Sequence, residues 1–122
     1  MVNVNRYTKI DIMEELEEKL SSNIKDLISF LEQYDQKRWV FLLSQELAAY
    51  EKTSLSAPRD RISNRKAILR KIEGLFGGMG ALNDVFIMIK GDKEKTILIN
   101  KELSSKIEAL LIVISELRNS YK

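Results

Sequence analysis

A stripe of apolar residues, spaced three or four positions apart, runs through the first third of the chain. It consists of Met13, Leu16, Leu20, Ile24, Leu27, Leu31 and Tyr34. This spacing lines up the side chains along one face of an α-helix, and such a face needs a core to cover it. With 122 residues, of which 44% are apolar, the chain is long enough to bury that core without disulfides or metals. The stripe therefore predicts a helical globular protein.

Similar stripes predict further helices. They comprise Trp39, Val40, Leu43, Leu47 and Tyr50, then Ile68, Leu69, Ile72, Leu75 and Phe76, and finally Leu103, Ile107, Leu110, Ile114 and Leu117. We expect a break at Asp35–Lys37, a loop over Thr53–Ser63 around Pro58, and a helix start near Asn64. The polar run Ser21–Asn23 leaves open whether residues 13–34 form one helix or two.

The segment from 85 to 100 is ambiguous. Val85–Ile89 and Thr96–Asn100 are β-branched runs on either side of Lys90-Gly91-Asp92-Lys93. The composition favours a small β-hairpin near 85–100, and an extension of the last helix is the competing interpretation. We therefore predict a mainly α fold over residues 1–122, a single-domain bundle of four to five helices with or without that hairpin.

The absent residue types narrow the chemistry. The chain has no cysteine and no histidine, so it lacks thiol nucleophiles and the commonest general base near neutral pH. We expect no enzyme, no cofactor and no metal site. The N-terminus has no signal pattern, and the longest apolar run, Ala109–Ile114, is too short to span a bilayer. We therefore expect a cytoplasmic protein without a membrane partner.

The most unusual motif is a glycine-rich turn, with Gly77, Gly78, Gly80, Asn83 and Asp84 as its key residues. Successive glycine amides could cradle a phosphate, but the spacing matches neither common phosphate-binding loop, and the Asp84 charge would repel an anion. We interpret the motif as structural, a helix stop followed by a close-packed reversal with Asn83 and Asp84 bonding local backbone amides.

The segment from Phe76 to Ile87, preceded by a helix pair carrying Trp39, resembles an uncharacterised family of small bacterial proteins with a G-G-M-G-x-x-N-D signature. In size and style the chain also resembles the immunity proteins of contact-dependent inhibition systems. That second resemblance implies a protein that binds a cognate toxin domain and occludes its active site or an adjacent surface.

A cluster of acidic residues is compatible with this function. Asp11, Glu14, Glu15 and Glu18 are expected on the helix face away from Met13, Leu16 and Leu20. A toxin that cuts nucleic acids presents positive charge to hold phosphates. An acidic helix can imitate a phosphate group and so bind that positive charge. The residues are our candidates for partner binding, and a merely solvated face is the competing interpretation.

A basic segment supports an alternative function. Its candidate nucleic-acid-binding residues are Arg59, Arg61, Arg65, Arg70 and Lys71. A helical module could grip a phosphate backbone through them in a salt-dependent way. As a third possibility, the acidic and basic helices neutralise each other within the fold or across a homodimer.

Overall fold

The computed structural model describes residues 8–77 and 80–121. These residues form α1 (Lys9–Gln33), α2 (Lys37–Lys52), η2 (Thr53–Leu55), α3 (Pro58–Gly74), η3 (Leu82–Asp84) and α4 (Lys93–Ser120). No strand occurs among them. The prediction of a mainly α bundle with four to five helices is confirmed.

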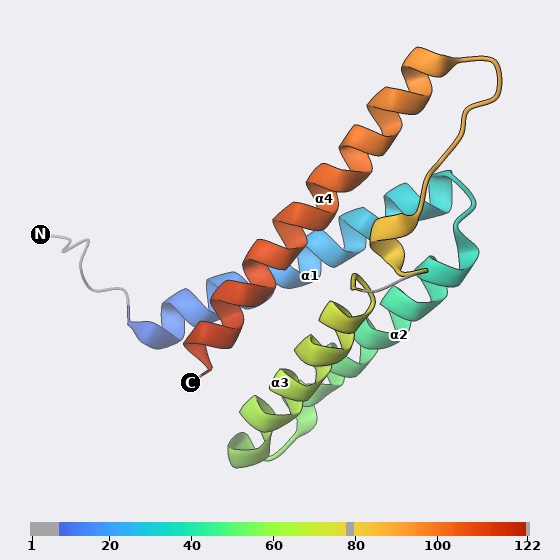
Figure 1. The fold of residues 1–122 in the computed structure, drawn as a ribbon. Coiled ribbons are helices and arrows are strands. Elements are labelled where there is room, and N and C mark those ends of the chain that lie inside the picture. The colour runs from blue at the N-terminus through green and yellow to red at the C-terminus, as the bar shows by residue number, and fades with distance from the viewer. Residues whose placement is uncertain (1–7, 78–79, 122) are drawn as a thin grey trace, which may run out of the picture.

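The long helices α1 and α4 form one half of the fold, and α2 and α3 form the other (Figure 1). Helix α1 packs against both α4 and α2, while α3 packs against α2 and α4. The end of α4 returns to the start of α1, as Figure 1 shows. Side chains at the start of α1 and at the end of α4 therefore lie near one another.

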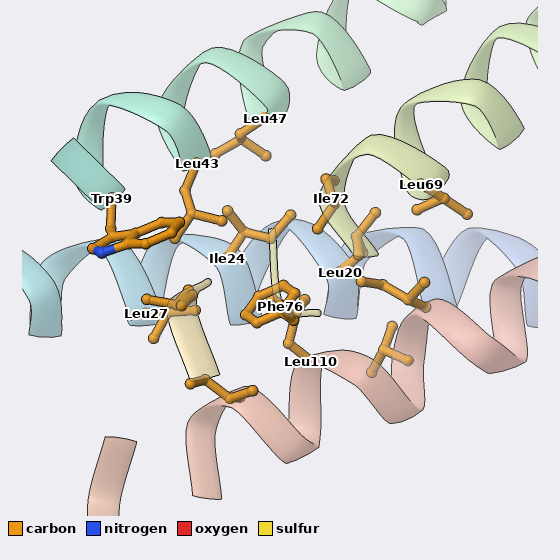
Figure 2. Packing of buried hydrophobic residues seen from close by; sticks show 14 of the residues in the cluster. Leu20, Ile24, Leu27, Trp39, Leu43, Leu47, Leu69, Ile72, Phe76 and Leu110 are labelled. Atoms are coloured by element: carbon orange, nitrogen blue, oxygen red, sulfur yellow. The ribbon is translucent and has the colours of Figure 1, made fainter. Parts of the chain in front are cut away.

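The predicted stripes meet in one hydrophobic core. Figure 2 shows Leu20, Ile24 and Leu27 of α1 facing side chains from the other helices and Phe76. Several core side chains have no exposed surface, and they include Leu20, Ile24, Leu27, Leu43, Leu69, Ile72, Leu110 and Ile114. Because each fully buried aliphatic side chain contributes about 1.5–3 kcal/mol, these contacts supply the main stabilisation of the fold.

Helix α1 is continuous through the polar run that could have divided it. The apolar stripe keeps its phase through Ser21–Asn23, so the next residue, Ile24, stays buried in the core. A capping box starts the helix: the Thr8 hydroxyl accepts a hydrogen bond from the Asp11 amide. The reversal after α1 uses Asp35 in the left-handed conformation, with φ 59°. The predicted break at 35–37 is confirmed, although α2 already begins at its last residue, Lys37.

The predicted start of α3 near Asn64 was wrong. The helix begins at Pro58, so the predicted loop over Thr53–Ser63 is reduced to η2 and a few residues. Proline suits the first helical turn because it has no amide to leave unpaired and its φ is already helical. Asp60 in the same turn adds favourable charge near the positive end of the helix dipole.

The predicted hairpin near 85–100 was also wrong, because Thr96–Asn100 lies in α4. Asp92 caps that helix by accepting a hydrogen bond from the Lys95 amide at 3.0 Å. Thr96 and Ile99 are buried and Leu103 continues their spacing, so the helical period outweighs the β-branched composition. The other half, Val85–Ile89, lies outside the helices and has no partner strand among the described residues.

Candidate partner-binding surface

Three of the four predicted partner-binding carboxylates form an exposed acidic surface on α1. Glu14, Glu15 and Glu18 are all exposed, and no ion pair or side-chain hydrogen bond engages them within the described residues. Leu16 and Leu20 on the opposite face are buried and hold the helix against the core. The acidic side chains are therefore presented on a rigid element. We call Glu14, Glu15 and Glu18 the acidic surface.

Asp11, the fourth predicted residue, has a separate structural task. Its carboxylate accepts hydrogen bonds from the backbone amide of Thr8 at 3.0 Å and from its hydroxyl at 2.9 Å. The backbone bond, with help from the hydroxyl, lowers the pKa of Asp11. Asp11 therefore carries charge at the start of α1 while it completes the helix cap.

The segment from 11 to 18, called the acidic segment below, contains one carboxylate that sequence reasoning left out of the site. Glu17 is largely buried, and its Oε2 atom accepts a hydrogen bond from Arg65 Nη1 at 2.6 Å. Tyr121 donates to the same oxygen at 2.6 Å, and the Tyr50 hydroxyl lies 3.3 Å away from it. The two tyrosine hydroxyls also bond each other. Glu17 thus ties α1 to α2, to α3 and to the end of α4.

Burial raises the pKa of both Tyr50 and Tyr121, and the Glu17 carboxylate raises that of Tyr121 further. Both phenols therefore stay protonated and able to donate. Position 17 follows Met13 by four residues and precedes Leu20 by three, so it borders the apolar stripe. That position was the available signal that Glu17 points toward the core edge and not toward solvent.

A shallow cleft of about 380 Å³ lies beside this network. Its lining residues are Glu14, Glu17, Glu18, Ser21, Tyr50, Glu51, Ser54 and Arg65. The one cation among them, Arg65, is already paired with Glu17, so the carboxylates of Glu14, Glu18 and Glu51 leave the cleft negative. The cleft can accept a lysine or arginine side chain from another molecule. Glu15 does not line it and extends the acidic surface on the other flank.

The structure separates the predicted nucleic-acid-binding residues. Arg65 is paired inside the protein, and Arg61 donates to the backbone carbonyls of Ser54 and Ser56 at 3.2 and 3.3 Å. Arg59, Arg70 and Lys71 remain exposed on α3. A second cleft, of about 400 Å³, is lined by Lys66, Arg70, Ser115, Arg118 and Asn119.

The glycine motif is only partly described, because Gly78 lies outside the described residues. Gly80 adopts a φ of +75°, and its amide donates to the Asp84 carboxylate at 2.8 Å. That amide is therefore occupied by a carboxylate of the chain itself and does not face an external anion. Gly77 and Asn83 are exposed, and Asn83 borders a shallow depression against α4.

No family model, curated protein or solved structure matches this chain. Within residues 8–77 and 80–121, no group of acidic side chains is arranged to hold a metal ion. None of the helices described there is long and apolar enough to cross a membrane.

Proposed function

We propose that this protein is a cytoplasmic bacterial immunity protein, which binds a cognate toxin domain and occludes its active site or a neighbouring surface. The observation that carries the proposal is the negative cleft beside the acidic surface. Glu14 and Glu18 line it without an internal cation, whereas Glu17 between them is matched by Arg65. Unmatched carboxylates on a rigid helix are available to a positively charged partner.

The chemistry favours a toxin with a basic active site, such as a nuclease. A nuclease presents lysine and arginine side chains that hold phosphates, and a cluster of carboxylates competes for the same groups. One basic side chain of the toxin would enter the cleft between Glu14, Glu18 and Glu51. Opposite charges would also steer the two proteins together, so association should slow as the salt concentration rises.

The test combines a binding measurement with a charge-reversal series. The protein is co-expressed with the C-terminal domain encoded by the neighbouring gene, and complex formation and protection from toxicity are scored. Glu14→Lys, Glu15→Lys and Glu18→Lys are then introduced together. We expect a nanomolar complex whose dissociation constant rises by at least 100-fold in this variant, mainly through slower association at low salt.

The chain offers a control with the same change in net charge. Glu102, Glu108 and Glu116 are exposed on α4, and their reversal to lysine should leave the affinity within about threefold of the unmodified protein, about 0.65 kcal/mol or less. Circular dichroism should show unchanged helix content in both variants. The absence of any complex, or an equal loss of affinity in both variants, would contradict the proposal.

A nucleic-acid-binding module is the second candidate. Its supporting observation is the convergence of Lys66, Arg70 and Arg118 at the second cleft, although Arg118 is also paired with Glu73 at 2.9 Å. The engagement of Arg61 and Arg65 inside the fold weakens this candidate.

An electrophoretic shift of RNA or DNA at low salt tests the second candidate. The shift should disappear in a variant with Arg59→Ala, Arg70→Ala and Lys71→Ala, all of which are exposed positions. If the unmodified protein gives no shift at low salt, nucleic-acid binding is excluded as its function.

A further inference from the structure

The segment Val85–Ile89 is held along α4 by side chains that take the place of a neighbouring β-strand. The Ile87 amide donates to Asn100 Oδ1 at 2.9 Å, and Asn100 Nδ2 donates to the Ile87 carbonyl at 2.7 Å. The Ile89 amide donates to Thr96 Oγ1 at 2.9 Å, and that hydroxyl lies 3.2 Å from the Ile89 carbonyl. The backbone amide and carbonyl of both Ile87 and Ile89 thus have hydrogen-bond partners on the edge that faces α4.

The spacing of these contacts requires an extended backbone. Thr96 and Asn100 are one helical turn apart, a rise of about 6 Å, and two residues of an extended chain span about 6.7 Å. The segment therefore runs antiparallel to α4 with Ile87 beside Asn100 and Ile89 beside Thr96. Figure 1 shows it on the outside of the molecule, between η3 and the start of α4.

Among the described residues, none is hydrogen-bonded to the opposite edge of the segment. In an extended chain, the backbone groups of Phe86 and Met88 point away from those of Ile87 and Ile89. Neither backbone forms a hydrogen bond within the described residues. Phe86 and Met88 are 62% and 73% exposed, whereas Ile87 is buried. The segment therefore offers unpaired edge groups together with exposed apolar side chains, the combination that templates strand pairing.

We propose that this edge pairs with the same segment of a second copy of the chain, in an antiparallel register centred on Ile87. Phe86 of each copy then lies opposite Met88 of the other, and each such pair exchanges two amide–carbonyl hydrogen bonds. A thioether against an aromatic ring is a favourable contact. The bonds that hold the segment to α4 remain in place, because they use the other edge.

Charge complementarity selects a second copy as the occupant. The segment itself is uncharged and is flanked by Asp84 and Lys90. Asp84 ends η3, and one of its carboxylate oxygens accepts the Gly80 amide, so it lies at the end of the extended segment and not within it. The antiparallel register still brings this negative end of each segment to the Lys90 end of the other copy. A parallel arrangement would place like charges together and lose this match. The proposal uses residues outside the acidic surface and does not depend on the proposed toxin.

The first test measures the oligomeric state of the full chain by sedimentation equilibrium across a range of concentrations. Met88→Pro removes one edge amide that the fold does not use and fits extended backbone after an extended residue. We expect the unmodified protein to dimerise and Met88→Pro to raise the dimer dissociation constant at least tenfold. Met88→Leu, which keeps the amide and the bulk, serves as the matched control and should dimerise normally.

A second test determines the register. The chain has no cysteine, so Phe86→Cys and Met88→Cys can each supply one unique thiol. A mixture of the two variants should cross-link with a short thiol reagent mainly between the unlike chains. A monomer at all concentrations, a dimer unaffected by Met88→Pro, or preferential cross-linking of like chains would each overturn the proposal.

Discussion

The Oε2 atom of Glu17 lies 2.6 Å from Nη1 of Arg65, and the two side chains are only 17% and 13% exposed. This pair joins the acidic segment of α1 to the basic segment of α3, 48 residues further along the chain. Part of the opposite charge of these segments is thus neutralised within the fold. Glu14, Glu15 and Glu18 of the same helix form no ion pair within the described residues.

The first prediction concerns the strength of this pair. Because the pair is mostly buried, Glu17→Gln should lower the free energy of unfolding by about 2–4 kcal/mol, leaving Arg65 without its anion. A double-mutant cycle with Arg65→Met should give a coupling of about 1–3 kcal/mol in urea unfolding. The exposed pair Asp35 and Lys37, at 3.7 Å, is the control and should couple by less than about 0.5 kcal/mol. Equal couplings would mean that burial does not strengthen the Glu17–Arg65 interaction.

The second prediction concerns alkaline pH. The pKa values of Tyr50 and Tyr121 are raised in the folded protein from an ordinary value of 10.0. The unfolded chain therefore releases these protons first, so their contribution to stability is complete below about pH 10 and is lost as the pH rises above it. Above pH 10, each phenol should lower the free energy of unfolding by about 1.4 kcal/mol per pH unit.

Urea unfolding measured from pH 8 to 11.5 checks the alkaline prediction. Tyr121→Phe removes one of the two groups, so its stability should fall less steeply above pH 10 than that of the unmodified protein. Tyr34→Phe is the control, since the Tyr34 hydroxyl makes no hydrogen bond within the described residues. An unchanged slope in Tyr121→Phe would contradict the assigned cause.

The third prediction concerns the anchoring of the extended segment. Asn100→Ala removes both side-chain bonds to Ile87 and should destabilise the fold by about 1–3 kcal/mol. Hydrogen exchange should accelerate more at the Ile87 amide than at the Ile89 amide, because the Thr96 hydroxyl still accepts a hydrogen bond from the Ile89 amide. Lys101→Ala at an exposed neighbouring position is the control. Equal acceleration at both amides would show that the segment opens as one unit.

The fourth prediction compares two glycines. Gly91 has a φ of +80°, whereas Gly74 ends α3 with helical backbone, and a Cβ at either position would meet nothing within 4 Å. Gly91→Ala should cost about 1 kcal/mol of stability through backbone strain alone. Gly74→Ala should instead stabilise by about 0.5–1 kcal/mol. Thermal unfolding of the two variants measures the difference, and shifts of the same sign would contradict it.

The helices could be predicted because their apolar residues repeat at the helical period. The stripe from Met13 to Tyr34 predicted α1, and the spacing around Leu43 and Leu47 predicted α2, because burial of such faces dominates the energy of folding. The start of α3 was missed because Pro58 was interpreted as part of a loop, although proline also suits a first turn. The boundaries of a helix depend on a few capping residues and not on the spacing of its apolar residues.

The helical state of Thr96–Asn100 and the buried network around Glu17 could not be derived in the same way. Thr96 serves the fold as a side-chain partner for Ile89, a role that β-propensity does not reveal. Within the acidic segment, Glu17 differs from Glu14 and Glu18 through contacts with Arg65 and Tyr121, both far away in the sequence. Such contacts depend on how the helices assemble, which local patterns do not encode.

The single tryptophan of the chain, Trp39, is 8% exposed and lies beside Leu27 and Leu43 in the core (Figure 2). The Arg38 guanidinium lies 5.3 Å from the centre of its ring. The fluorescence of Trp39 therefore reports whether the core is intact. In the sequence, Trp39 is more than 20 residues away from the carboxylates of residues 14–18. Its emission should shift to longer wavelength when a variant unfolds. Charge reversals on the acidic surface should leave that emission unchanged, so one optical signal separates damaged folding from altered recognition.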